Sequence, residues 1–80
     1  MNNKKKYPYS ESRAHGTKAQ KELITKPQLR HIRYLTKLRP EEVLNEILDC
    51  IPGDLELEDL TMGQASFVIG CLVGDIKPVG

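Results

Sequence analysis

Two short segments with the same spacing constrain the fold of this chain more than any other feature. Each places a threonine three residues before a glutamine: Thr25 and Gln28 in the first, Thr61 and Gln64 in the second. In this pattern the threonine hydroxyl accepts from the glutamine backbone N–H, while the glutamine side chain reaches back to the threonine backbone N–H. Each segment therefore predicts the first turn of an α-helix. Pro27 supports the first of these predictions, because proline is tolerated in a first helical turn.

Apolar residues at helical spacing follow in three segments. Residues 25–38 carry Leu29, Ile32, Leu35 and Leu38, residues 40–51 carry Val43, Leu44, Ile47, Leu48 and Ile51, and residues 61–73 carry Phe67, Val68, Ile69, Cys71, Leu72 and Val73. The third segment is apolar around most of its circumference, which is typical of a buried helix. Arg39 is disfavoured in a helix because Pro40 follows it, so the first segment ends there. We predict an all-α fold, a three-helix domain over residues 24–76.

The remaining segments are expected to be irregular. Residues 1–23 combine scattered charges with no periodic apolar positions, which predicts a disordered basic N-terminal arm. Residues 54–59 alternate acids with Leu55 and Leu57, so we expect an extended connector whose leucines close one end of the core. Residues 77–80 form a tail.

Catalytic and metal chemistry have little support in this sequence. Cys50 and Cys71 lie in apolar runs without a nearby histidine, which predicts reduced core residues and no metal site. A disulfide between them is the minor alternative. His15 and His31 are the only histidines, and neither has the spacing of a catalytic arrangement. We expect a protein that is not an enzyme and needs no cofactor.

The sequence does not predict a membrane-inserted protein. The longest apolar run, residues 67–73, is far shorter than the roughly 20 residues that span a bilayer. No apolar segment follows the first charges, so we expect no secretory signal and a cytoplasmic location.

The net charge of +1 conceals two halves of opposite sign. Residues 1–39 contain eleven Lys and Arg against two acids, and residues 40–80 contain one Lys against nine acids. In the first predicted helix Lys26, Arg30, Arg33 and Lys37 share one face, with His31 and Tyr34 at its flanks. Such a stripe can follow the phosphates of a nucleic acid, and arginine suits bidentate phosphate contacts. In the arm, Lys4, Lys5 and Lys6 can add phosphate contacts, and Tyr7 and Tyr9 can stack on bases.

Three alternatives remain open for these surfaces. Acids of the second helix, Glu42, Glu46 and Asp49, can instead face the basic stripe within the domain. The acidic half, chiefly Glu56, Glu58 and Asp59, can dock on a basic protein. Small residues on the third helix, Ser66, Gly70 and Gly74, can admit a second copy of the chain as a homodimer.

A family resemblance covers about 48 of the 80 residues, from Thr25 to Leu72. It rests on Thr25-x-x-Gln28-x-x-x-Ile32-x-x-Leu35, followed by Asp59-Leu60-Thr61-x-x-x-Ala65-Ser66-x-x-Ile69-x-x-Leu72. This pattern resembles a small helical module found at the ends of phage and plasmid recombination and single-strand-annealing proteins. The resemblance implies a phage or mobile-element context in DNA metabolism, a partner-docking role and no catalytic residues.

Overall fold

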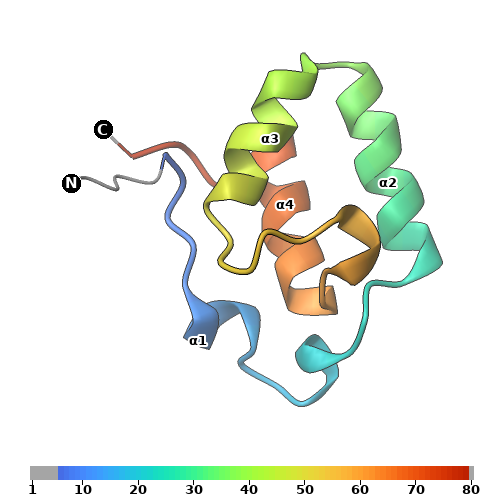
Figure 1. Ribbon diagram of the computed structural model, residues 1–80, viewed down its shortest axis with the longest axis vertical. Helices are drawn as coiled ribbons and strands as arrows, with labels where there is room; N and C mark the ends of the chain where they lie inside the picture. The colour runs from blue at the N-terminus through green and yellow to red at the C-terminus, as the bar shows by residue number, and fades with distance from the viewer. Residues whose placement is uncertain (1–5, 80) are drawn as a thin grey trace.

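The structure, a computed structural model, describes residues 6–79 except for the side chain of Arg13. It contains α1 (Glu11–Ala14), α2 (Lys26–Lys37), α3 (Glu41–Asp49) and α4 (Met62–Val73), with 3-10 turns η1 (Ala19–Lys21) and η2 (Leu57–Asp59). The three longer helices form a bundle in which α2 and α4 point the same way and α3 the opposite way (Figure 1). The predicted all-α, three-helix domain is confirmed.

Both predicted capping boxes are present. The Thr25 hydroxyl accepts from the Gln28 backbone N–H at 3.3 Å, and the Gln28 Oε1 accepts from the Thr25 backbone N–H at 3.1 Å. Thr61 and Gln64 form the same pair of hydrogen bonds, at 3.1 and 2.9 Å. The local sequence therefore sets where α2 and α4 begin.

The two capped helix starts lie side by side. Leu23 and Thr61 form an isolated antiparallel bridge, in which the Ile24 N–H donates to the Leu60 carbonyl at 2.8 Å. The Gln28 amide adds a hydrogen bond to the Met62 carbonyl at 3.2 Å. These contacts hold the beginnings of α2 and α4 at the same end of the bundle.

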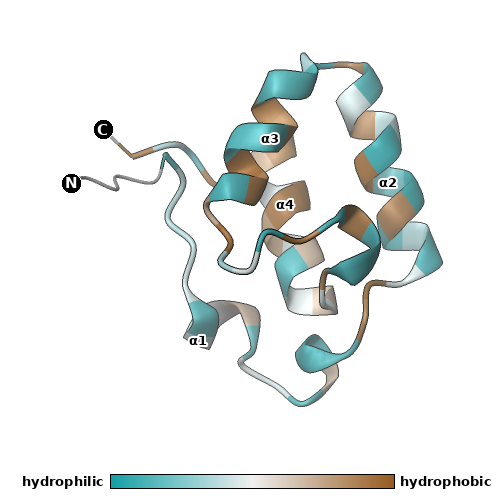
Figure 2. Cartoon of the chain, in the orientation of Figure 1, coloured by the Kyte–Doolittle hydropathy of each residue, from teal (hydrophilic) through white to brown (hydrophobic). Residues whose placement is uncertain are grey.

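The helix α4 is the centre of the core. It contacts α2, α3, α1 and η1, and most of its residues are buried. The largest fully buried side chains are Ile32 of α2, Ile47 of α3, and Leu60, Val68 and Leu72. Hydrophilic and hydrophobic residues alternate around α2 and α3 in Figure 2, as expected for helices with one buried face.

The connector joins this core through its leucines, as expected. Leu55 and Leu57 are partly buried and pack against the buried cluster. The connector is not extended throughout, because Leu57–Asp59 forms the η2 turn. This turn determines where the acids of the connector point.

The extent of the predicted arm is corrected over residues 6–23. Tyr7 and Ala14 are only 7% and 4% exposed, and the Tyr7 N–H donates to Cys50 Sγ at 3.2 Å. The Tyr9 ring packs edge-on against Phe67, with ring centroids 5.1 Å apart. These residues order the segment although they follow no helical period. Residues 1–5 of the predicted arm lie outside the described residues.

Candidate functional site

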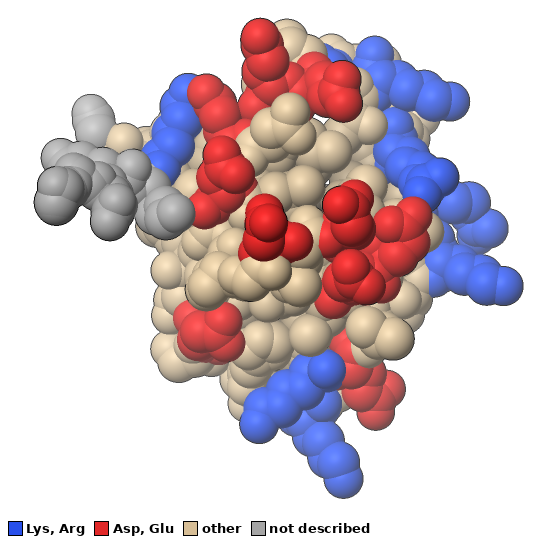
Figure 3. Space-filling view, in the orientation of Figure 1, with Lys and Arg blue, Asp and Glu red and all other residues tan. Residues whose placement is uncertain are grey.

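The basic strip of α2, defined as Lys26, Arg30, Arg33 and Lys37, faces solvent along its whole length. Its spacing of four, three and four residues keeps the four side chains on one helix face. Ile32, on the opposite face, is fully buried and fixes which side of α2 turns outward. Figure 3 shows Lys and Arg side chains projecting along the edge of the molecule formed by α2.

One member of the basic strip has a carboxylate partner among the described residues. The Arg33 Nη2 lies 2.7 Å from the Glu58 Oε2, and the two side chains are 56% and 59% exposed. Lys26, Arg30 and Lys37 make no ion pair with any described residue. The α3 residue Glu46 does not face the strip and instead pairs with Lys6 at 3.1 Å.

Tyr34 is the exposed aromatic residue beside the basic strip. It is 59% exposed, and Leu38, one helical turn later, is also exposed. The two tyrosines of the arm, which were expected to stack on bases, pack against the protein instead. Tyr7 is buried against the core, and Tyr9 packs on Phe67. Among the described residues, Tyr34 is therefore the one exposed tyrosine, and its ring is accessible to a planar ligand.

Of the three arm lysines predicted to contact phosphate, the structure describes Lys6, which does not join the basic strip. Lys6 donates to Glu46 of α3 at 3.1 Å, and this hydrogen bond and the Glu46 charge raise the pKa of Lys6. The first described residues lie on the side of the bundle opposite α2 (Figure 1). Lys4 and Lys5 lie outside the described residues.

Carboxylates gather on a surface that borders the basic strip. Residues 41–59 contain eight Asp and Glu and no Lys or Arg, whereas residues 24–39 contain five Lys and Arg and no acid. All eight are exposed: Glu41, Glu42, Glu46, Asp49, Asp54, Glu56, Glu58 and Asp59. We call these eight residues the acidic surface. They spread over α3 and the connector beside the basic edge (Figure 3).

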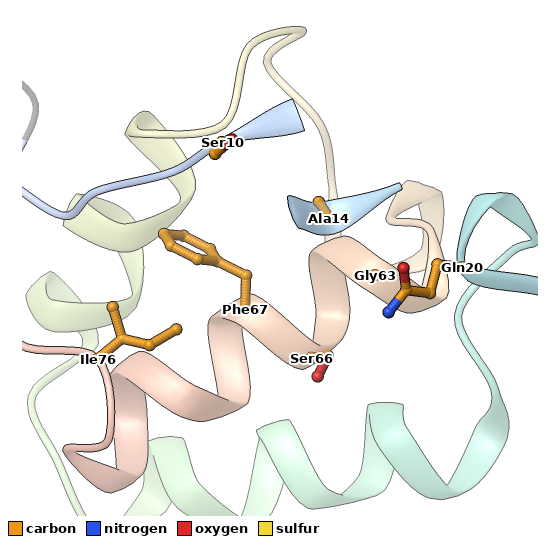
Figure 4. Close-up of a pocket in the computed structure, with 7 residues that line it drawn as sticks. All are labelled: Ser10, Ala14, Gln20, Gly63, Ser66, Phe67 and Ile76. Carbon is orange, nitrogen blue, oxygen red and sulfur yellow. The ribbon is translucent and has the colours of Figure 1, made fainter. Parts of the chain in front are cut away.

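A hollow of about 140 Å³ lies between the arm and α4. It is lined by Ser10, Ala14, Gln20, Gly63, Ser66, Phe67 and Ile76. Figure 4 shows Phe67 and Ile76 at one end of the hollow and Gln20 at the other. No lining side chain titrates near neutral pH, so these residues supply no acid or base for catalysis.

The two cysteines are free and buried, in agreement with the predicted reduced core residues. Burial raises the pKa of Cys71 to about 12, and the nearby Cys50 adds to the effect, so the thiol stays protonated at neutral pH. Within residues 6–79, no three His, Cys, Asp or Glu side chains are arranged so that they could hold a metal ion.

The small residues that could admit a second copy, Ser66 and Gly70 of α4 and Gly74 just beyond it, are partly covered by the chain itself. The Ile76 side chain lies over Gly70, where an added Cβ would come within 2.8 Å of the Ile76 Cδ1. The Ile76 N–H also donates to the Gly70 carbonyl at 3.0 Å. A second copy packing at Gly70 must therefore displace Ile76.

In comparisons with known proteins, no family model, no curated protein and no solved structure matches this chain. None of the described helices has both the length and the apolar character needed to cross a bilayer. The resemblance of residues 25–72 to recombination-protein modules stays a prediction.

Proposed function

We propose that this chain is a small non-enzymatic accessory protein of phage or mobile-element type that binds nucleic acid, or a nucleic-acid–protein complex, through the basic strip of α2. The observation that carries the proposal is the orientation of this strip. Its four cations face solvent, and three of them have no carboxylate partner among the described residues.

The dimensions of the strip suit a row of phosphates. From Lys26 to Lys37 the helix rises about 16 Å, at about 1.5 Å per residue. A nucleic-acid strand presents several phosphates over that length, since its repeat is about 3.4 Å in a duplex. Arg30 and Arg33 can each hold a phosphate through two N–H groups, and Tyr34 offers a ring for base stacking.

A titration with matched variants tests this proposal. Binding of a labelled oligonucleotide would be followed by fluorescence anisotropy at two salt concentrations. Arg30→Gln with Lys37→Gln should weaken binding strongly at low salt, because two phosphate contacts are lost. Lys18→Gln with Lys77→Gln removes the same charge from exposed positions outside the strip and should weaken binding much less. Absence of wild-type affinity at low salt, or equal loss in both variants, contradicts the proposal.

A second candidate is docking of the acidic surface on a basic protein. It is favoured by the outward orientation of the carboxylates, since α3 turns its acids to solvent rather than to the basic strip. Glu56→Lys with Asp59→Lys should then abolish capture of such a partner while leaving the helix content unchanged. Unchanged capture by this variant argues against it.

A further inference from the structure

The ion pair between Arg33 and Glu58 places a carboxylate where the proposed function needs a phosphate. Arg33 is the third of the four cations in the basic strip, between Arg30 and Lys37 along α2. Its guanidinium donates to the Glu58 carboxylate at 2.7 Å. This hydrogen bond occupies Nη2, one of the guanidinium nitrogens that would hold a phosphate oxygen.

The position of Glu58 is fixed by residues on either side of it. Leu57 is partly buried against the core, and Leu60 is fully buried. Between them, the η2 turn holds Glu58 next to the outer face of α2, so its carboxylate remains close to Arg33. Both partners are more than half exposed, and an exposed ion pair is weak and screened by salt. A phosphate and the Glu58 carboxylate can therefore compete for Arg33 on similar terms.

We infer that Glu58 is a built-in competitor for the nucleic-acid phosphate at Arg33, and that it sets the affinity and the salt dependence of the basic strip. This inference rests on the proposed function. When Glu58 holds Arg33, three cations of the strip bind phosphates and release counterions. When the Glu58 charge is removed, all four cations of the strip bind phosphates and release counterions.

The test compares two substitutions that remove the same charge from the same connector. In Glu58→Gln the competitor of Arg33 is lost. In Glu56→Gln an exposed carboxylate without an ion pair to any described residue is lost. The full chain would be titrated into a labelled single-stranded oligo-deoxythymidylate, by fluorescence anisotropy, over a series of salt concentrations. Circular dichroism would verify that both variants keep the helix content of the wild type.

Glu58→Gln should tighten binding about threefold at low salt, the size expected for one exposed ion pair. The plot of log affinity against log salt should become steeper by about 0.7, the contribution of one additional phosphate on a single strand. Glu56→Gln should tighten binding less and leave the slope unchanged. In an Arg33→Gln background, Glu58→Gln should lose its effect on the slope.

Two results overturn the inference while leaving the proposed function in place. One is an equal effect of Glu58→Gln and Glu56→Gln on affinity and slope, with wild-type binding intact. The other is an effect of Glu58→Gln on the slope that persists when Arg33 is replaced by Gln. If neither the wild type nor Glu58→Gln binds at low salt, the proposed function fails and this inference fails with it.

Discussion

Replacement of Gly63 by alanine should detach the arm from α4. Gly63 lies in the first turn of α4, directly against the backbone of Ala14. An added Cβ would overlap the Ala14 carbonyl oxygen, and a backbone group cannot rotate aside as a side chain can. The arm must therefore move by roughly 2 Å to restore an ordinary van der Waals separation.

The loss of stability in Gly63→Ala can be estimated from the contacts that this movement breaks. Ala14 is nearly fully buried, and Tyr9 is held edge-on against Phe67. Loss of an aromatic pair costs about 0.5–1.5 kcal/mol, and the accompanying loss of apolar burial costs about 1.5–3 kcal/mol for one large side chain. These contributions together lead us to expect that Gly63→Ala lowers the free energy of unfolding by about 2–4.5 kcal/mol.

Gly70→Ala is the matched control, because Gly70 is another glycine of α4. There the added Cβ would meet only the flexible side chain of Ile76, with Cδ1 at 2.8 Å and Cγ1 at 3.2 Å. Alanine gains about 1 kcal/mol over glycine in a helix interior, which offsets that crowding. The free energy of unfolding of Gly70→Ala should stay within about 1 kcal/mol of the wild type.

Urea unfolding, followed by far-ultraviolet circular dichroism, measures both changes. Limited trypsin digestion reports on the arm directly, because Lys18 and Lys21 lie between α1 and α2. Gly63→Ala should be cleaved faster at these two lysines, while the three-helix part persists. If Gly63→Ala matches Gly70→Ala in stability and in cleavage rate, the packing of the arm on α4 is refuted.

Two further predictions concern the helix caps and a buried thiol. Thr25→Ala and Thr61→Ala should each lower the free energy of unfolding by about 1 kcal/mol, whereas serine at either position should retain most of it, as urea unfolding can measure. The pKa of Cys71 is raised from 9.0 to about 12, so between these values the folded state keeps a proton that the unfolded state releases. Stability should therefore fall as pH rises from about 9 toward 12, and Cys71→Val should lack this part of the decline when unfolding is measured at several pH values.

The helices of the bundle are predictable from the sequence because their signals are local. Thr25 and Thr61 form their caps with residues only three positions away. The packing of the arm is not predictable in this way. Tyr7 hydrogen-bonds Cys50, 43 positions along the chain, and Ala14 meets Gly63 through its backbone carbonyl. Neither contact leaves a periodic pattern in the arm itself.

In the candidate site too, the local features are predictable from the sequence and the tertiary contacts are not. The basic strip follows from helical spacing, since one buried residue, Ile32, determines which face of α2 turns outward. The pairing of Arg33 with Glu58 cannot be predicted from helical spacing. The η2 turn that positions Glu58 depends on the tertiary packing of Leu57 and Leu60. Its signal in the sequence is indirect: apolar residues on both sides of Glu58 anchor the turn.

The most direct measurement is a nuclear magnetic resonance titration of the nitrogen-15-labelled chain with a short oligonucleotide at low salt. Binding through the basic strip predicts that amide shift changes concentrate in Lys26–Lys37, and around Tyr34 in particular, and that they fade as salt is added. Shift changes confined to α3 and the connector, or no shift changes at all, would contradict the proposed function.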